Sequence, residues 1–349
     1  MSALTHLERE FINRFQGGFP LAERPFSQLA ERLGTRETNL IQTIASLLHR
    51  GFLSRFGPLY DAERLGGAVT LSALEVPAAD YERVTAEVNA LPAVAHNYRR
   101  EHRLNMWFVL ASEHPAGIAA ALAEIEQRTG LPVYDFPRQQ AFYLGLWLHL
   151  DNDGQVDTRS TESAAIVDPE PAATGGTGDG ADAGSDIAAD WQPDTLDRRL
   201  LRATQRGLQL CSDPWSALAK QLDSSAGEIL ARLRAMLAAG VIRRIGAVPN
   251  HYRLGLRGNG MSVWDVPDDV AAQLGRGIGA LDCVSHCYLR PRHEGVWPYN
   301  LFAMLHGGDR ETVLARVRQI EQRLGAHCRG RDILFSTAVL KKTGLQLAT

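Results

Sequence analysis

The chain has 349 residues, of which 45% are hydrophobic and 22% are charged. This length exceeds that of a typical single domain and the composition is that of an ordinary globular protein, so we expect at least two hydrophobic cores. No apolar run approaches the roughly 20 residues of a membrane span, and the N-terminus lacks the basic-then-apolar pattern of a signal peptide. We therefore expect a cytoplasmic protein.

The net charge of −3 is unevenly distributed along the chain. The segment 151–190 contains ten acidic residues and one arginine, which leaves 36 basic and 30 acidic residues in the remainder. This excess of positive charge favours an anionic partner, although it is far below that of an obligate DNA-binding protein. The four cysteines, Cys211, Cys283, Cys287 and Cys328, lack the spacing of zinc or redox motifs and are expected to be reduced thiols.

The first half begins with a helix-turn-helix pattern over 25–57, in which a short helix, a turn and a longer helix that ends at Gly51 lead into a short strand. A strand around 69–76, a helix over 76–91, strands at 96–98 and 104–112, a helix over 115–130 and a last strand at 142–150 should follow. This βαββαβ order is typical of a ferredoxin-like fold with two helices on one sheet face.

The segment 151–190 is rich in Gly, Ala, Asp, Ser, Thr and Pro, and we expect it to be a flexible acidic linker. After it the whole pattern repeats, because 214–246 matches 25–57 and a second βαββαβ order follows. The predicted class is α+β, with five parts: winged helix-turn-helix units over 1–60 and 191–250, ferredoxin-like units over 61–150 and 251–349, and the linker.

The helix-turn-helix units invite a DNA-binding interpretation. However, the turns that lead into their second helices, "TRETN" and "SSAGE", contain few side chains that read base edges or hold phosphates. The sequence therefore favours a packing or dimerisation role and makes DNA binding an unfavoured alternative.

The bends in the middle of each half are more informative. "VAHNYRR" aligns with "VSHCYLR", so a His-x-Tyr-x-Arg pattern occurs twice, and on a strand its members share one face. Arginine captures carboxylates or phosphates in a planar, bidentate manner, and imidazole is the usual proton donor near neutral pH and a common iron ligand. The pattern predicts a polyanionic ligand with one group that undergoes proton-coupled chemistry. The candidate catalytic residues are His96, His286 and His102.

Further candidates surround these bends and the wing of the second copy. The wing arginines and histidine could equally be a solvated surface, and aromatic side chains on a strand are more often simply core. The predicted substrate-binding residues are Tyr98, Arg99, Arg100, Arg243, Arg244, His251, Tyr288, Arg290, Arg292, Trp297 and Asn300. The chain has no phosphate-binding loop, nucleophile elbow, zinc-protease motif or dinucleotide fingerprint, so we expect no organic cofactor.

A helix-turn-helix unit followed by a βαββαβ unit resembles the leucine-responsive and asparagine-type regulators. The strings "HNYRREHRLNMWFVL", "VIRRIGAVPNHYRLG" and "SHCYLRPRHEGVWPYNLF" are instead similar to those of the siroheme decarboxylases, which are built on that architecture. The resemblance covers nearly the whole chain outside the linker, and it implies that two related subunits are fused here and pair within one chain, with further oligomerisation open.

The resemblance implies that siroheme is the substrate, that two of its acetate groups lose CO2, and that didecarboxysiroheme serves a haem pathway, such as that of the denitrification haem. His96 or His286 would supply a proton or contact the substrate iron, which makes iron part of the substrate. Two alternatives remain open, a tetrapyrrole-responsive transcription regulator and a tetrapyrrole carrier without catalysis.

Overall fold

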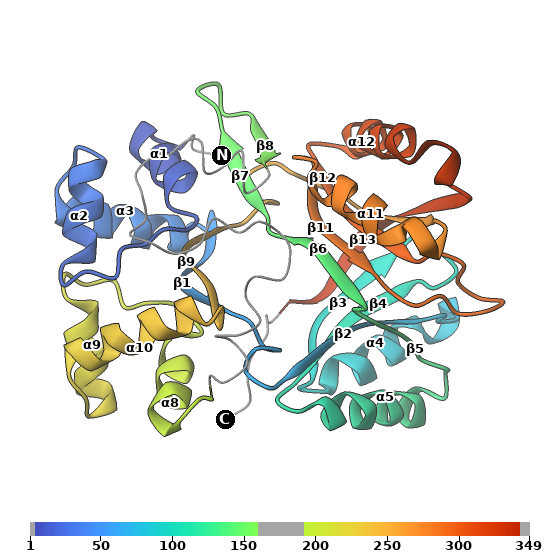
Figure 1. Ribbon diagram of the computed structural model, residues 1–349, viewed down its shortest axis with the longest axis horizontal. Coiled ribbons are helices and arrows are strands. Elements are labelled where there is room, and N and C mark those ends of the chain that lie inside the picture. Colours follow the sequence, from blue (N-terminus) through green and yellow to red (C-terminus); the bar gives the residue numbers. More distant parts are fainter. Residues whose placement is uncertain (1–3, 160–191, 343–349) are drawn as a thin grey trace.

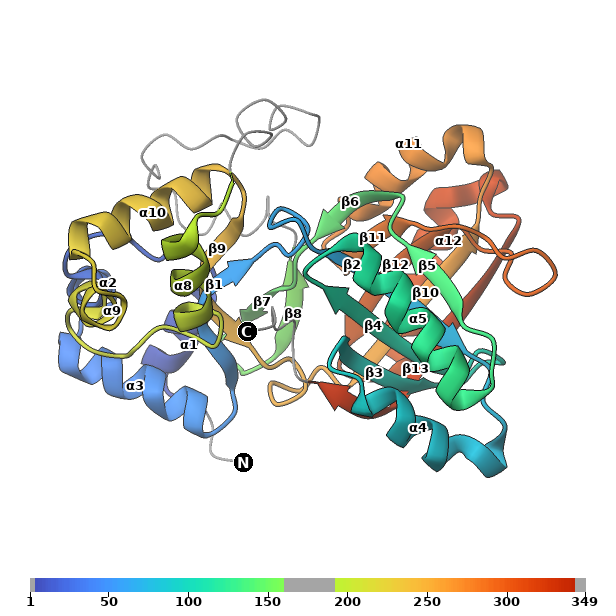
Figure 2. The same ribbon diagram turned by 90° about the horizontal axis from the view of Figure 1, so that it is seen from below.

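The computed structural model describes residues 4–159 and 192–342 (Figure 1). Two groups of elements lie side by side. One is a bundle that contains the helices of both helix-turn-helix units, and the other is a large sheet whose helices cover its outer side (Figures 1 and 2). The candidate site residues come from the sheet and from the chain that connects it to the bundle.

Equivalent helices of the bundle begin with equivalent signals. A capping box formed by Thr5 and Glu8 starts the first helix of copy one, and Asp194 and Asp197 form the capping box of its counterpart. Proline occupies the first turn of the second helix in both copies, where its missing N–H has no cost. The helices are α1 (His6–Arg14), α2 (Pro25–Arg32), α3 (Glu37–His49), α8 (Thr195–Thr204), α9 (Pro214–Leu222) and α10 (Ala226–Ala238).

The bundle joins the two copies through one hydrophobic core and one strand pair. Phe26 and Phe56 of copy one belong to the same core as Trp215 and Leu233 of copy two. The wing strands β1 (Leu53–Tyr60) and β9 (Ile242–Pro249) pair antiparallel with each other. The helix-turn-helix units thus serve to pack the halves together.

The wing pairing depends on a glycine at the crossing point. Gly57 lies opposite Gly246, and a Cβ atom at Gly246 would lie 2.6 Å from the backbone of Gln16, which is far inside a normal contact. A side chain here would push α1 away from the wing. A Cβ atom at Gly57 would likewise lie 2.9 Å from the backbone nitrogen of Leu208, so a close backbone approach requires glycine at this position in both copies.

The two ferredoxin-like units form one nine-stranded sheet in the order β5-β2-β4-β3-β13-β10-β12-β11-β6. Copy one contributes β2 (Ala68–Leu74), α4 (Tyr81–Ala90), β3 (Val94–Arg100), β4 (Met106–Ser112), α5 (Pro115–Thr129), β5 (Tyr134–Pro137) and β6 (Gln140–Leu144). Copy two contributes β10 (Gly258–Asp265), α11 (Asp268–Gly279), β11 (Val284–Leu289), β12 (Leu301–Gly307), α12 (Arg310–Leu324) and β13 (Gly330–Lys342). Single 3-10 turns, η1 (Ala78–Asp80) and η2 (Gly325–His327), precede α4 and follow α12.

The last strand of each unit crosses into the other unit. β13 pairs with β10 as far as Phe335, and from Ser336 onward it pairs with β3 of copy one. In the same way β5 pairs with β2, and β6, which is separated from β5 by two residues, pairs with β11 of copy two. The predicted pairing of the halves within one chain is therefore present, and each His-x-Tyr-x-Arg strand has a neighbour from the opposite copy.

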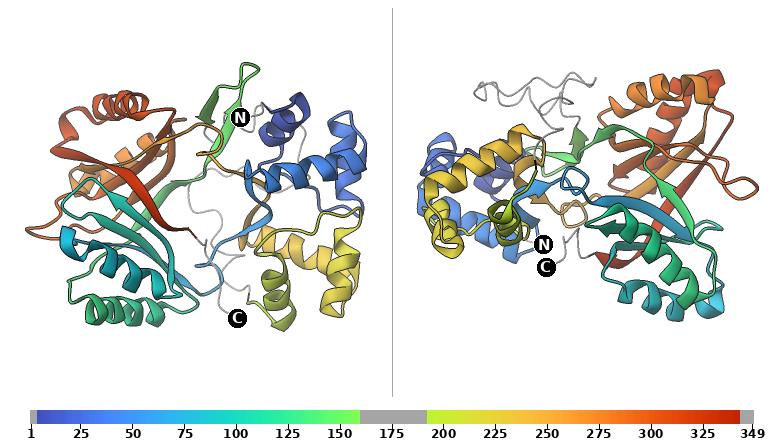
Figure 3. Two further views of the ribbon diagram at one scale, coloured as in Figure 1. Left: turned by 180° about the vertical axis from the view of Figure 1, so that it is seen from behind. Right: turned by 60° about the horizontal axis from the view of Figure 1, so that its bottom comes forward.

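The helices and a second core lie on opposite faces of the sheet. Helices α4 and α5 cover copy one and α11 and α12 cover copy two, all on the outer face (Figures 2 and 3). The inner face carries a core to which both copies contribute, including Trp107, Phe302 and Leu334. The end of β13, red in Figure 3, points toward the helical bundle.

Two expectations need correction. The strand predicted at 142–150 breaks at Gly145, and Trp147–Leu150 form a separate strand, β7, which pairs with β8 (Val156–Arg159) inside the predicted linker. The side chains of Asn13 and Gln16 bind the backbone of β7 through both their oxygen and nitrogen atoms, and this fixes the hairpin against α1. The remainder of the predicted linker, 160–191, lies outside the described residues. None of the described helices is long and apolar enough to cross a bilayer.

Candidate functional site

His286 and Tyr288 project from the face of β11 that is turned away from the helices. Their neighbour Cys287 points the other way, into the core beneath α11, where its thiol lies 3.5 Å from the carbonyl oxygen of Gly275. Because successive residues on a strand alternate in direction, His286 and Tyr288 share the inner face. The predicted shared face of this pair is therefore present in copy two.

The surroundings of His286 disfavour its charged form. Protein atoms enclose the ring closely, although it retains some exposed surface. Burial, together with the positive charges of Arg243 and Arg290, lowers the pKa of His286 to about 4. At neutral pH the imidazole is uncharged. A ligand with several carboxylates would compensate these cations and so restore the capacity of the ring to bind a proton.

Arg290 lies between Tyr288 and the backbone of copy one. Its guanidinium is 5.0 Å from the centre of the Tyr288 ring and donates to the carbonyl oxygen of Phe136, while its Nε is buried without a partner in the described structure. Burial lowers the pKa of Arg290 to about 10 and raises that of Tyr288 to about 12. A second cation, Arg138, lies 5.9 Å from the Tyr288 ring. Arg138 is itself paired with the carboxylate of Glu63, whereas Arg290 donates to a backbone carbonyl oxygen.

Copy one repeats this arrangement around His96. The guanidinium of Arg100 is 5.6 Å from the Tyr98 ring and donates to the carbonyl oxygen of Leu334 at 2.7 Å, again a backbone group of the opposite copy. The Nε of Arg100 is also buried without a partner in the described structure. Burial lowers the pKa of His96 to about 4, and the ammonium of Lys342 adds to the effect. Both copies therefore present a neutral His beside a Tyr and a buried Arg.

The segment that leaves the bundle after β9 brings a third histidine to this face. Burial, Lys342 and His286 together lower the pKa of His251 to about 4. The ring of His251 is 4.9 Å from that of His306, and the Lys342 ammonium is 5.4 Å from the ring of Tyr252. Lys342 lies opposite His96 in the pairing of β13 with β3, and its charge also acts on His251.

Of the two wing arginines, Arg243 is the one that faces this cluster. It is exposed and its charge acts on both His286 and Tyr288. Arg244 is instead buried against the bundle, where it donates to the carbonyl oxygen of Gln16 and lies 4.8 Å from the ring of Trp147. Burial lowers the pKa of Arg244 to about 10. The prediction that the wing carries ligand-binding cations is thus more plausible for Arg243 than for Arg244.

Three predicted binding residues have structural partners away from His96, His251 and His286. Arg292 pairs with Asp265 at 2.7 Å and with Asp268 at 2.6 Å. Asn300 accepts from the backbone N–H of Val266 at 3.1 Å, and the equivalent Asn105 does the same for Val76 at 3.0 Å. Asn300 therefore holds the turn after the first strand of its unit. Trp297 is 1% exposed and packs against Trp107 and Phe136, so it belongs to the inner core rather than to an open wall.

Two more predicted residues point elsewhere. Arg99 is exposed on the helix face of β3, with its guanidinium 4.4 Å from the ring of Tyr81 in α4. His102 follows the end of β3, where its Nδ1 accepts from the N–H of Leu104 at 2.9 Å and its Nε2 lies 3.7 Å from Asp332. Both contribute to an open cleft of about 430 Å³ at that end of the strand, together with Thr337. His96 lies near the other end of the same strand, whereas Arg100, at the end of the strand, also lines this cleft.

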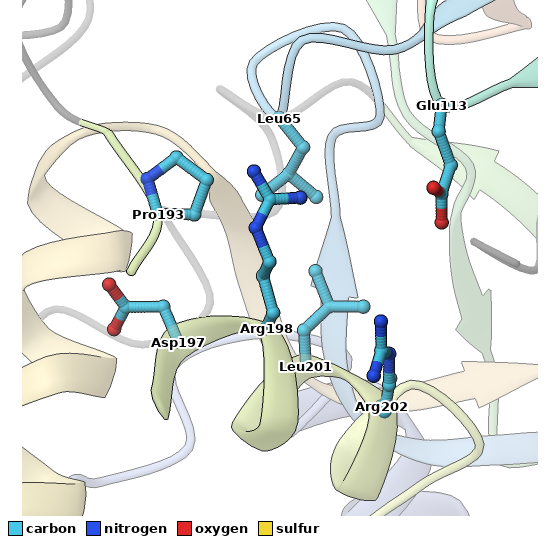
Figure 4. Close-up of a pocket in the computed structure, with 7 residues that line it drawn as sticks. All are labelled: Leu65, Glu113, Pro193, Asp197, Arg198, Leu201 and Arg202. Atoms are coloured by element: carbon cyan, nitrogen blue, oxygen red, sulfur yellow. The ribbon is translucent and has the colours of Figure 1, made fainter. Parts of the chain in front are cut away.

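Sequence reasoning missed His306, Ser285, Tyr252, Arg138 and Lys342. His306 lies in the strand "LFAMLHG", where alternation puts it on the face of Phe302 and Met304, and no neighbouring charge draws attention to it. A further pocket, shown in Figure 4, lies beside α8 and contains none of the predicted site residues. It is lined by Leu65, Glu113, Pro193, Asp197, Arg198, Leu201 and Arg202. Its carboxylate Asp197 is already paired with Arg232 at 3.0 Å.

Family models match both repeats. A model for the siroheme decarboxylase NirDL-like HTH domain matches residues 8–53 and 197–243. A model for the AsnC-like ligand binding domain matches residues 64–142 and 253–341. Together they cover most of the described chain and agree with the predicted architecture, a tandem of helix-turn-helix and ferredoxin-like units.

Curated proteins and solved structures that are similar to this chain include siroheme decarboxylases. The siroheme decarboxylase of Hydrogenobacter thermophilus is 33% identical over 97% of this chain and 93% of its own length. The siroheme decarboxylase NirH subunit of Paracoccus pantotrophus is 56% identical over 44% of this chain and 96% of its own length, as expected if separate subunits correspond to one half. The crystal structure of the siroheme decarboxylase NirDL in complex with an iron-uroporphyrin III analogue aligns with a TM-score of 0.67 at 29% identity, over 98% of this chain and 93% of that one. The chain belongs to the siroheme decarboxylase family.

Proposed function

We propose that this protein is a siroheme decarboxylase that removes CO2 from two acetate side chains of siroheme and releases didecarboxysiroheme for haem synthesis, with that of the denitrification haem as the favoured route. The observation that carries this proposal is the doubled His-Tyr-Arg arrangement on one face of a shared sheet, beside Arg243 and Lys342. Full-length similarity to named siroheme decarboxylases supports the substrate.

The cations match the charge of the substrate. Siroheme carries eight carboxylates, and each carboxylate that leaves water must gain a charged or hydrogen-bonding partner. Arg243 is exposed and free to adjust, whereas Arg100 and Arg290 are fixed by backbone carbonyls and each retains a buried Nε without a partner in the described structure. We assign these three arginines to the carboxylates that do not react.

The reaction itself requires a place for electrons and a proton. Loss of CO2 from an acetate breaks the bond between its methylene and carboxyl carbons and leaves the electron pair on the methylene carbon, where the macrocycle delocalises it. A proton must then reach that carbon to give a methyl group. His96 and His286 are the proton donors that the geometry offers, since both rings face inward and keep some exposed surface.

The binding of a polyanion favours protonation of His96 and His286. Both histidines are neutral in the free protein because burial and neighbouring cations lower their pKa values to about 4. Carboxylates that neutralise those cations raise the pKa values again, so substrate binding and proton uptake occur together. No step needs an organic cofactor, because the macrocycle of the substrate is the electron sink.

The test is anaerobic incubation of the purified full-length chain with siroheme, followed by mass analysis of the extracted tetrapyrrole. Loss of two CO2 units supports the decarboxylase. Siroheme that is bound but unchanged over many hours would contradict it and would leave the carrier, or a regulator if a specific DNA site is found by titration at stated salt. A double variant, His96→Ala with His286→Ala, serves as the control for turnover by the proposed donors.

A further inference from the structure

A chain of hydrogen bonds leads from His286 into the interior of copy two. His286 Nδ1 lies 2.9 Å from the hydroxyl of Ser285, and this hydroxyl lies 2.8 Å from Nε2 of His306. On the far side of the His306 ring, Nδ1 lies 2.5 Å from Oδ1 of Asn259. The three partners are buried and come from three adjacent strands, β11, β12 and β10.

The direction of every proton in this chain follows from its inner end. The amide nitrogen of Asn259 donates to the carbonyl oxygens of Leu256 at 3.4 Å and Arg257 at 3.3 Å. Carbonyl oxygens only accept, so the amide nitrogen must face them and Oδ1 must face His306. Since Oδ1 is an acceptor, the proton of the His306 ring resides on Nδ1.

The next link follows from the neutrality of His306. The ring is 3% exposed, and burial, helped by nearby histidines and Arg316, lowers its pKa well below the usual range. A neutral ring with a proton on Nδ1 has a lone pair on Nε2, which must accept. Ser285 has one hydroxyl proton, and it donates this proton to Nε2 at 2.8 Å rather than to the more distant carbonyl oxygen of Met304 at 3.3 Å.

The Ser285 oxygen is then left as an acceptor toward His286, so the Nδ1 of His286 must donate to it. We propose that Ser285, His306 and Asn259 are positioning residues that hold His286 in the tautomer with its proton on Nδ1, so that Nε2 carries the lone pair on the side of the substrate. None of the three touches the reacting atoms; they act through His286.

Copy one lacks the whole device. In copy two, Asn259 lies opposite His306 in the pairing of β10 with β12. The equivalent pair in copy one, where β2 pairs with β4, is Val69 and Ala111. The residue before His96 is Ala95, where copy two has Ser285. In agreement with this, Nδ1 of His96 is buried without a partner in the described structure. No hydrogen bond to Nδ1 therefore fixes the orientation of the His96 ring in the described structure, and His96 and His286 differ chemically.

The difference between His286 and His96 affects how each ring delivers a proton in the reaction. This inference rests on the proposed function. A proton taken up at Nε2 of His286 leaves the Nδ1–H bond to Ser285 in place, and its transfer to the methylene carbon returns the ring to the same tautomer. His286 can therefore cycle without turning its ring, whereas His96 has no such constraint. We assign the more efficient proton delivery to His286.

The first test needs no substrate. In the full-length chain labelled with nitrogen-15 in its 11 histidines, the ring signals of His286 are identified by their loss in His286→Gln. We expect the neutral ring to be protonated at Nδ1 above pH 6, and Ser285→Ala to yield a mixture of both tautomers or the opposite one. A wild-type ring protonated at Nε2, or a tautomer unchanged in Ser285→Ala, would refute the relay.

The second test measures turnover. Ser285→Ala should lower kcat on the order of tenfold with little change in KM, and Ser285→Thr, which keeps the hydroxyl, should restore most of it. The matched control is Ser262→Ala, which removes a buried serine on β10 that bonds to the Ala303 carbonyl outside this chain, and its kcat should be unchanged. Equal losses in both alanine variants would reduce Ser285 to a structural residue. If the protein has no decarboxylase activity, the turnover test cannot give its expected result and the proposed function is wrong. The tautomer of His286 measured in the first test is independent of that outcome.

Discussion

Mild acid should destabilise the free protein because four histidines of the site, His96, His251, His286 and His306, are buried in neutral form. His96, His251 and His286 have folded pKa values of about 4, whereas an unfolded histidine titrates near 6.5. The unfolded chain therefore binds protons more readily than the folded chain between pH 6.5 and pH 4. Stability is complete above this window and is lost as the pH falls through it.

The size of the loss follows from the two pKa values. For one such histidine the linkage relation gives about 0.2 kcal/mol at pH 7 and about 2 kcal/mol at pH 5. The three histidines with folded pKa values of about 4 would together give about 5 kcal/mol, and the surface that each ring keeps exposed reduces this to roughly 3 kcal/mol. The buried His306 adds a further loss in the same direction. A typical domain has a free energy of unfolding of about 5 to 15 kcal/mol, so the effect is easily measured.

The assay is urea unfolding of the full-length chain at pH 7 and pH 5. The change in free energy between the two pH values should shrink by about one quarter in His286→Gln and in His96→Gln, since four histidines contribute to it. The exposed His114→Gln is the matched control, and its pH dependence should equal that of the unchanged protein. Carboxylates with lowered pKa values, such as Asp268, also contribute to the free energy of unfolding, but this contribution is lost only at lower pH. Equal stability at both pH values, or the same slope in His286→Gln, would refute the reasoning.

Three further outcomes are expected. Replacement of Arg243 by Gln should weaken siroheme binding about tenfold with little change in the unfolding midpoint, whereas Arg244→Gln should chiefly lower the midpoint; equal effects on binding would contradict the placement of these side chains. Trp297→Ala should cost about 3 to 5 kcal/mol in urea unfolding, because it empties the core between the two units, and a cost below about 1 kcal/mol would show that the ring is not core. Gly246→Val should prevent the wing from packing on α1, which circular dichroism melting would detect as a large fall in Tm, and an unchanged Tm would contradict the close approach.

The sequence contained enough to predict the repeated architecture but not how the halves are joined. Helix starts, alternating strands and the repeated His-x-Tyr-x-Arg pattern are local signals, and their positions in the structure agree with them. The crossing of β6 and β13 into the opposite unit is a non-local pairing with no local signal. For the same reason His306 and Lys342 could not be assigned to the site, since their neighbours His251 and His96 come from distant parts of the chain.

The binding-site predictions have the least structural support where a polar or aromatic side chain has another use that composition does not reveal. Asn300 and Arg292 stand in a bend rich in candidates for anion binding, yet they satisfy the backbone of Val266 and two carboxylates at the turn before α11. Trp297 was expected as a flat wall for a flat ligand, and it fills the core instead. A single sequence shows the residue types of a bend but not which of them are needed to hold that bend in place.

The union of two halves in one chain explains how the site can be asymmetric. In a symmetric homodimer each substitution occurs on both sides, so a relay behind one histidine would also stand behind the other. Here Ser285 and His306 have alanines as their counterparts, while the pairing of β3 with β13 and of β11 with β6 keeps the halves in a fixed relation. One histidine can then be specialised for proton delivery while the other adapts to a different task. Two acetates that react in sequence on an asymmetric macrocycle would require such a division.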